Sequence, residues 1–281
     1  FDNLLWCLFS LRYRSILGRC YYSSSVLHYA ESLSSFGSMQ NVEYHAIVDS
    51  NMANKRRTSS PPALYQLYYF PIPGRAEGVR VALSLAHLSW KDNEIMGEQY
   101  AQMKNDGELP WGMVPILQTP DGTLAESTAI LRYIGGMAGL TPSDPFQAAK
   151  VDEFLDGMEP FSRVLSGTFS MDDVDERTKA RQAVFNEEGD GTKNLKLIQT
   201  KITESTTGWA ANTRDMSIAD IRAFCGIFGL FSGNFDGIDK SILADYPGLL
   251  EYHDKVANEP RIAKHYANIA EGSLRWTYQP N

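Results

Sequence analysis

The stretch YQLYYFPIPGRAE, residues 65–77, constrains the fold most, because a strand pattern runs directly into a turn and a helix pattern. Residues 65–70 alternate between two faces and are rich in tyrosine, which is typical of a strand. Residues 71–74 contain two prolines and a glycine, which end a strand because proline cannot donate to a ladder. The helix pattern that follows has an apolar stripe of Ala76, Val79, Ala82, Leu83 and Ala86, with Arg75, Glu77 and Arg80 off the stripe. A strand, a short turn and a helix form the first part of a βαβ unit, whose turn leaves the carboxyl end of the strand open to a ligand.

The composition excludes several classes of function. The 281 residues, 43% of them hydrophobic, suffice for two domains with a core. A formal net charge of −8 argues against a nucleic-acid partner and against an anionic membrane surface, because both require clustered positive charge. The three cysteines are too few and too scattered for a disulfide framework or a zinc site. We therefore expect a protein of a reducing compartment, cytoplasmic, without a bound metal and without a membrane span.

The first 62 residues differ in composition from the remainder of the chain. They contain a short apolar run at residues 4–9, which is shorter than a signal-peptide core and has no positive charge before it. The serine-rich, arginine-containing part that follows is typical of organelle transit peptides. The alternative is upstream sequence translated in frame, since Met52 is a plausible start. Under either interpretation we expect residues 1–62 to be a disordered leader.

The next segments predict the rest of a small α/β unit. Residues 89–96 suggest a second strand, parallel to the first and reached by a crossover. Residues 97–109 are polar and irregular, consistent with a loop over the site. In the strand-like run that follows, the Val114–Pro115 bond requires either a cis peptide or an edge position, because proline breaks a ladder.

A hairpin and a helix complete this unit. Residues 118–124, QTPDGTL, carry a Pro-Asp-Gly turn between two strand runs, and residues 126–137 have helical periodicity. We therefore expect an α/β domain over residues 63–138 and a linker of helix breakers at residues 139–144. From residue 145 to residue 281 strand patterns vanish, which predicts an all-α second domain.

One motif in the second domain is interpreted as structural. Ser217 can cap a helix that begins at Ile218, and Asp220 can answer as the reciprocal partner of a capping box. Cys225 and its aromatic neighbours on this helix are expected to lie in the core.

Tyr69 carries a specific resemblance. A tyrosine followed by Phe70 and then by Gly-Arg-Ala-Glu, residues 74–77, resembles the start of a cytosolic glutathione transferase of the tyrosine type, closest to the sigma, pi and mu classes. The resemblance covers roughly residues 64–266. It implies a thioredoxin-like α/β domain before an all-α domain, and it implies that the Tyr69 phenol lies beside the sulfur of bound glutathione. The alternative for Tyr69 is one more strand aromatic packed in a core.

A single phenol is sufficient for this chemistry. A thiol with an ordinary pKa of about 8.5 needs a shift of about 1.5 units, roughly 2 kcal/mol, to be half ionised near pH 7. One hydrogen bond to a charged group contributes about 1.5–3 kcal/mol. Tyr69 can supply it as a neutral donor, and neither a metal nor a catalytic triad is needed.

The resemblance implies further site residues. Arg75 would tune the thiolate, and the alternative for this residue is an exposed cation that caps the helix. The glutathione contacts would come from Tyr100, Lys104, Met113, Val114, Pro115, Glu126 and Ser127. The Glu126–Ser127 pair agrees with elementary physics, because the start of a helix binds a carboxylate while Glu126 can receive an ammonium. The alternative for this pair is a plain helix cap.

Three positions depart from the family pattern, and one of them, Pro73, stiffens the turn that borders the expected second-substrate pocket. Met113 stands where the sigma class often has a lysine, so one ion pair to the glycyl carboxylate is missing. Pro160 stands where related classes have an aspartate that reaches the partner subunit, and Glu159 or Asp156 is the candidate replacement.

The resemblance also implies a second-substrate pocket and an activity. The expected lining residues are Ile72, Pro73, Phe161, Val164, Leu165 and Thr168, with Trp276 and Tyr278 closing the pocket. An apolar pocket beside a thiol site suits a hydrophobic electrophile. We expect a homodimeric glutathione transferase active in detoxification. Glutathione peroxidase activity is a second activity that the resemblance allows. The alternatives are a sigma-type prostaglandin isomerase and a non-catalytic, crystallin-like ligand carrier.

Overall fold

The computed structural model describes residues 65–280, and the predicted leader lies outside the described residues. The first elements form a four-stranded sheet of β1 (Tyr65–Tyr69), β2 (Trp90–Glu94), β3 (Ile116–Thr119) and β4 (Gly122–Ala125), in the order β2-β1-β3-β4. Strand β2 is parallel to β1, while β3 is antiparallel to both β1 and β4. The predicted crossover strand and the predicted hairpin are both confirmed.

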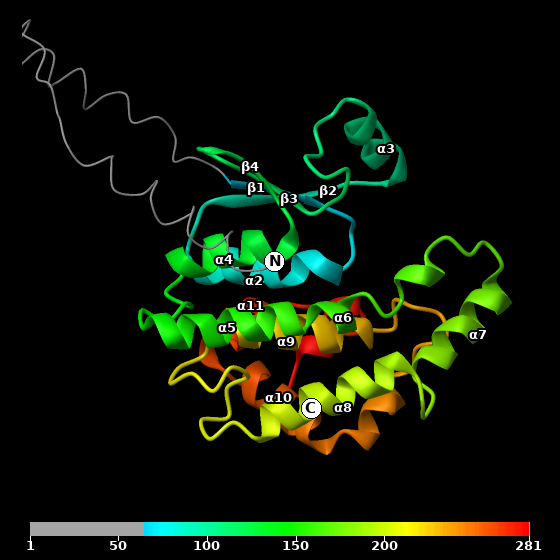
Figure 1. Cartoon of the computed structure of the whole chain (residues 1–281). Helices are drawn as coiled ribbons and strands as arrows, with labels where there is room; N and C mark the ends of the chain where they lie inside the picture. The colour runs from blue at the N-terminus through cyan, green and yellow to red at the C-terminus, as the bar shows by residue number, and fades with distance from the viewer. Residues whose placement is uncertain (1–64, 281) are drawn as a thin grey trace, which may run out of the picture. The chain divides into compact units, whose positions relative to one another are not determined.

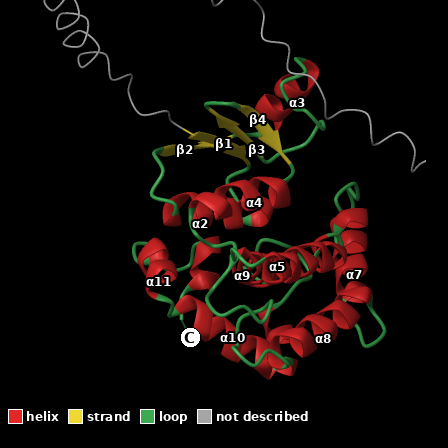
Figure 2. Ribbon diagram, turned by 60° about the vertical axis from the view of Figure 1, so that its left-hand side comes forward, coloured by secondary structure: helices red, strands yellow, loops and turns green. Residues whose placement is uncertain are grey.

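Three helices accompany the sheet. After the 3-10 turn η1 (Gly74–Ala76) come α2 (Glu77–Leu85), α3 (Gly97–Asn105) and α4 (Ser127–Met137). Helices α2 and α4 contact each other and cover the same face of the sheet (Figures 1 and 2). This arrangement is a thioredoxin-like α/β domain, as the family resemblance implies.

Helix α3 corrects the prediction of an irregular loop over residues 97–109. The backbone N–H of Met96 donates to the Oε1 atom of Gln99 at 3.0 Å and so closes the first turn of the helix. Only Met103 of this helix is buried. A polar helix with one buried residue lacks the apolar stripe by which amphipathic helices are found in a sequence.

The second domain is helical throughout the described residues. Its helices are α5 (Pro145–Gly157), α6 (Glu159–Ser162), α7 (Val174–Val184), α8 (Asp190–Thr203), α9 (Ile218–Leu230), α10 (Pro247–Ala257) and α11 (Pro260–Tyr266), with 3-10 turns η2 (Ser166–Thr168), η3 (Lys240–Asp245) and η4 (Leu274–Tyr278). Helix α9 is buried along most of its length and contacts α5, α10 and η4 within this domain. None of the described helices is long and apolar enough to cross a membrane.

The predicted capping box at the start of α9 is confirmed. The Asp220 carboxylate accepts the Ser217 N–H at 2.8 Å, and its other oxygen accepts the Ala210 N–H at 2.7 Å and the Tyr252 hydroxyl at 2.8 Å. The buried carboxylate therefore joins the cap of α9 to the preceding loop and to α10. Cys225 is buried in this core, as expected.

The two domains meet along α9, which packs against α2 and α4. Gly135 of α4 lies so close to α9 that a Cβ atom added there would be 2.3 Å from the Cγ2 atom of Ile218. Because α2 is covered on both sides, its charged residues Glu77 and Arg80 are also buried, although they lie off the apolar stripe.

A buried carboxylate connects α2 to the C-terminal elements of the helical domain. Glu77 accepts hydrogen bonds from Arg80 Nη1 at 3.1 Å, from the Tyr266 hydroxyl at 3.1 Å and from Arg275 Nε at 3.0 Å. Buried charges occur in native proteins when they are paired in this way. The cluster ties α2 to α11 and η4.

Candidate active site

Tyr69 is the last residue of β1, and the chain folds back over its phenol. The backbone N–H of Arg75 donates to the Tyr69 hydroxyl oxygen at 3.1 Å. Gly74 has a φ of 45°, and a Cβ atom there would lie 2.6 Å from the same oxygen. Glycine is therefore required at this position both for its backbone conformation and for its lack of a side chain.

The turn that shapes this region is held by Arg80, whose place in the sequence does not identify it as a site residue. Its Nη1 atom donates to the carbonyl oxygens of Ile72 at 3.0 Å and Pro73 at 3.2 Å, while Nη2 donates to that of Phe70 at 3.4 Å. Its Nε atom donates to Asp92 of β2 at 2.6 Å. In the sequence, the only indication that Arg80 binds the turn is that a charged residue lies off the apolar stripe of this helix.

The environment of the phenol keeps it protonated. Tyr69 is 7% exposed, and burial raises its pKa, although the Arg75 N–H and the charges of Arg75 and Arg80 act in the opposite direction. The oxygen accepts from a backbone amide, so its own proton remains available to a ligand. A neutral phenol that donates outward can stabilise an adjacent thiolate.

Arg75 is fixed by the helical domain. Both its terminal nitrogens donate to Glu159 Oε1 at 3.0 Å, and Glu159 also accepts from Arg163 Nε and from Arg222 Nη2, each at 3.0 Å. Burial alone would raise the pKa of Glu159, but the hydrogen bond from Arg163 and the charges of Arg75 and Arg222 hold it below its ordinary value. Glu159 is one of the two candidates to replace the cross-subunit aspartate of related classes. In the structure its carboxylate binds three guanidinium groups of its own chain.

The Glu126–Ser127 pair has an unusual backbone. Glu126 is exposed and has φ 66° and ψ 109°, in the left-handed region that residues other than glycine rarely adopt. Its side chain does not cap α4, so the plain-cap alternative is not supported. Strained backbone of this kind concentrates at ligand sites. The turn leaves the first N–H groups of α4, beginning at Ser127, available to an anion.

The Val114–Pro115 bond before β3 is a cis peptide, which is the first of the two alternatives that the sequence left open. Val114 is half-buried and packs with Tyr100 and Phe70 in one small apolar cluster. The Tyr100 hydroxyl donates to the carbonyl oxygen of Gly112 at 2.9 Å, so it holds this loop. Lys104 and Met113, the residues assigned to the glycyl end, are both exposed.

The predicted electrophile pocket is only partly accessible. Phe161, Leu165 and Pro73 are buried, and Phe161 and Leu165 belong to the main core. The Thr168 hydroxyl donates to the carbonyl oxygen of Leu165 at 2.8 Å and accepts from Arg181 at 3.0 Å, so it serves the helical domain. Ile72 and Val164 are half-buried and remain the accessible residues of the predicted set.

Tyr278 corrects another expectation, because it does not close a pocket. It is buried, its ring stacks on that of Tyr266 with centroids 4.9 Å apart, and its hydroxyl donates to the carbonyl oxygen of Cys225. Trp276, by contrast, is 42% exposed. A tyrosine near the C-terminal end of the sequence carries no signal that distinguishes a pocket wall from a core residue.

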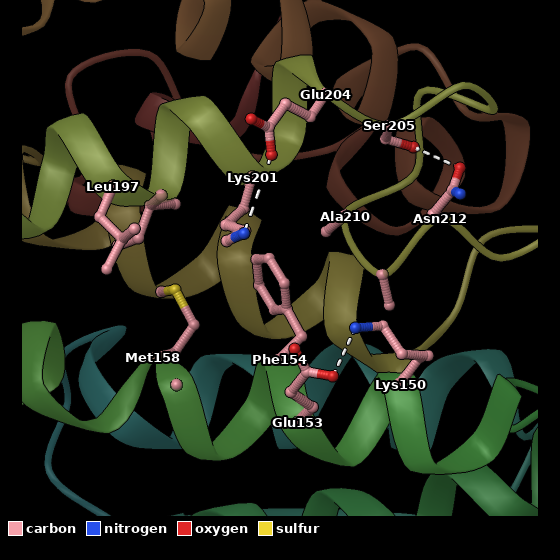
Figure 3. Close-up of a pocket in the computed structure, with 13 residues that line it drawn as sticks. Lys150, Glu153, Phe154, Met158, Leu197, Lys201, Glu204, Ser205, Ala210 and Asn212 are labelled. Atoms are coloured by element: carbon pink, nitrogen blue, oxygen red, sulfur yellow. Dashed lines mark hydrogen bonds and ion pairs between the residues drawn. The ribbon is translucent and has the colours of Figure 1, made fainter. Parts of the chain in front are cut away.

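A separate cavity of about 360 Å³ lies between α5, α8 and the loop before α9 (Figure 3). Phe154, Met158 and Leu197 contribute apolar surface, and the ion pairs Lys150–Glu153 and Lys201–Glu204 lie at its sides. None of the residues predicted for the glutathione site or for the electrophile pocket lines it. It is therefore distinct from the surroundings of Tyr69.

The fold and the site together define a thioredoxin-like domain that presents a neutral phenol and a helix start, joined to a helical domain. Residues 65–136 match the family described as Glutathione S-transferase, N-terminal domain, and residues 160–268 match Glutathione S-transferase, C-terminal domain. The chain therefore belongs to the glutathione S-transferase family and is an enzyme of its cytosolic pi, sigma and mu type.

Individual relatives agree with this assignment. Glutathione S-transferase P 1 of Xenopus laevis is 28% identical over 213 residues, which cover 73% of this chain and 93% of that protein. Glutathione S-transferase 1 of Ascaris suum is 33% identical over 134 residues, covering 48% of this chain and 59% of that protein. Among solved structures, prostaglandin synthase D of Nilaparvata lugens has a TM-score of 0.64 and 27% identity, covering 75% of this chain and 99% of its own.

Proposed function

We propose that the protein conjugates glutathione to hydrophobic electrophiles and that Tyr69 stabilises the reacting thiolate. The observation that carries the proposal is the phenol at the end of β1, whose oxygen accepts the Arg75 N–H at 3.1 Å and whose proton has no acceptor among residues 65–280. The thiol loses its proton to solvent, and the sulfur then forms a bond to an electrophilic carbon. The leaving group departs with its electron pair.

The same site supports a binding mode for glutathione. The γ-glutamyl carboxylate would lie at the start of α4, against the N–H groups that follow Glu126 and the hydroxyl of Ser127. The backbone of Val114 would pair with the cysteinyl part, beside Pro115. At the glycyl end, Lys104 is the available cation, because Met113 carries no charge and Tyr100 already donates to Gly112.

The second substrate would approach from the side of Ile72 and Val164, the accessible members of the predicted pocket. A hydroperoxide is a further substrate under this proposal. The thiolate would attack the O–O bond to give an alcohol and a glutathione sulfenic acid, and a second glutathione would convert the sulfenic acid to the disulfide and water. A role in detoxification, a cytoplasmic location and a homodimeric state complete the proposal, and sedimentation of the purified protein tests the last.

The substitution Tyr69→Phe tests the mechanism. We expect binding to immobilised glutathione to be nearly unchanged, while conjugation of a chloronitrobenzene near neutral pH falls about 10- to 100-fold, as for the loss of one hydrogen bond to a charged group. Tyr68→Phe is the matched control, because the neighbouring hydroxyl lies 3.3 Å from the side-chain oxygens of Gln66 and Gln118 and serves the sheet. Unchanged turnover in Tyr69→Phe would remove this phenol from the mechanism.

A second candidate activity is the isomerisation of prostaglandin-like endoperoxides. It is favoured by the similarity to the prostaglandin synthase D of Nilaparvata lugens, and it would use the same thiolate. Incubation with a prostaglandin endoperoxide and glutathione distinguishes the two, because an isomerase regenerates the glutathione whereas a conjugating enzyme consumes it.

A further inference from the structure

Arg222 is a buried cation of α9 that the proposed chemistry does not use. It is 6% exposed, and its Nη2 atom donates to Glu159 Oε2 at 3.0 Å and to the Ser162 hydroxyl at 2.7 Å. Its Nε atom is also buried and has no acceptor among residues 65–280. A buried polar group without a partner is destabilising, so native proteins retain few of them.

A small cavity with Arg222 in its wall lies at the junction of the two domains. Its volume is about 10 Å³, which is about the space for one water molecule. It is lined by Gly74, Arg75, Gly78 and Val79 from the turn and α2, by Ser127 and Leu131 from α4, and by Arg222, Cys225 and Gly226 from α9. A buried water needs about two to four polar partners. Arg75, Ser127 and Arg222 supply polar side chains on the walls of this cavity.

We propose that Arg222 is a positioning residue of the glutathione site, whose Nε–H reaches Ser127 through a water bound in this cavity. The inference rests on the proposed function, because Ser127 is the residue assigned there to the γ-glutamyl carboxylate. Glu159 and Ser162 hold the other end of the guanidinium, so the helical domain orients a group at the start of α4. A bridging water transmits such an interaction nearly as well as a direct hydrogen bond.

The charge of Arg222 acts in the same direction as its hydrogen bonds. Glu159 is one carboxylate shared by Arg75, Arg163 and Arg222, so this group of four side chains carries a net positive charge. Arg163 is exposed and screened by solvent, whereas Arg222 is buried, and buried charges are screened much less. A buried positive charge favours both the carboxylate and the thiolate of a bound glutathione.

The test compares Arg222→Met, Arg222→Lys and the control Arg163→Met. The control removes a partner of the same Glu159 carboxylate, but Arg163 does not line the cavity. The measurements are the dissociation constant of glutathione, the pH at which the bound thiol ionises, followed by ultraviolet absorbance of the thiolate, and the thermal unfolding midpoint without ligand.

We expect Arg222→Met to weaken glutathione binding about five- to tenfold, equivalent to about 1 kcal/mol, and to raise the pKa of the bound thiol. Arg222→Lys should keep the thiol pKa near that of the unchanged protein while still weakening binding. Arg163→Met should bind within about twofold of the unchanged protein. A folded Arg222→Met with unchanged affinity and unchanged thiol pKa would overturn the inference.

A crystal structure of the unsubstituted protein is a test that does not depend on the variants folding. Electron density for a water within hydrogen-bond distance of Arg222 Nε and the Ser127 hydroxyl is the expected result, and a dry cavity at high resolution would refute the bridge. Failure of the proposed function is recognised separately. In that case the unsubstituted protein would not bind glutathione, or Tyr69→Phe would conjugate normally.

Discussion

Replacing Arg275 by methionine tests whether the C-terminal elements stabilise the helix that carries the active-site turn. Arg275 Nε donates to the two oxygens of Glu77 at 3.2 and 3.0 Å, and Glu77 is fully buried. Removing one charged hydrogen-bond partner of a buried group costs about 1.5–3 kcal/mol. Because Glu77 keeps Arg80 and Tyr266, we expect a loss near the middle of this range, about 2 kcal/mol, rather than the roughly 3–5 kcal/mol of a fully orphaned charge.

Urea unfolding followed by tryptophan fluorescence measures this loss, and it corresponds to a fall in the melting temperature of about 4–8 °C for a protein of this size. The matched control is Arg261→Met. Arg261 pairs with Glu259 at 2.7 Å but is about half exposed, so its loss should cost about 0.5 kcal/mol or less. A double-mutant cycle with Glu77→Gln isolates the pair. Equal stabilities of Arg275→Met and Arg261→Met would refute the reasoning.

Two further predictions concern α4 and the phenol. Gly135→Ala should destabilise the protein by about 1–3 kcal/mol because the new methyl group would overlap Ile218. Gly136 is exposed, and a Cβ atom added there would meet nothing within 4 Å. Gly136→Ala should therefore stabilise the protein by about 0.5–1 kcal/mol. Thermal melting compares the two, and equal shifts would contradict the close packing of α4 on α9. Since burial raises the pKa of Tyr69, kcat/KM should rise as the thiol ionises and stay level through the ordinary phenol pKa of about 10. Because the phenol of the unfolded chain ionises at a lower pH than that of the folded protein, the contribution of Tyr69 to folding stability should fall above about pH 10. A decline of kcat/KM well below pH 10 in the folded enzyme would contradict the assignment of Tyr69.

The sequence predicts those parts of the fold that depend on neighbouring residues. The strand before Tyr69, the hairpin, the cis peptide at Pro115 and the capping box at Ser217 are all local, and each has a chemical reason within a few residues. Helix α3 was missed because it buries one residue and so carries no apolar stripe.

The parts that could not be predicted depend on contacts between distant segments. The sequence around Thr168 and Tyr278 is compatible both with a pocket wall and with hydrogen bonds inside the core. Only the packing of the helical domain determines which of the two each residue does. Arg80 and Arg222 gain their roles from carbonyl groups and a carboxylate that other elements supply. An isolated charge in a helix pattern is ordinarily read as a solvated position, which is why neither residue was assigned to the site.

The partnership of Glu77 with Arg275 has a consequence for biosynthesis. The two residues are separated by 198 positions. Glu77 is therefore synthesised long before Arg275 is added to the chain. A nascent chain that has completed only the thioredoxin-like domain holds Glu77 against Arg80 alone, with α9 and η4 still to be made. We therefore expect Tyr69 and the turn that follows it to reach their working geometry only after translation has passed Arg275, which makes this active site a late product of folding.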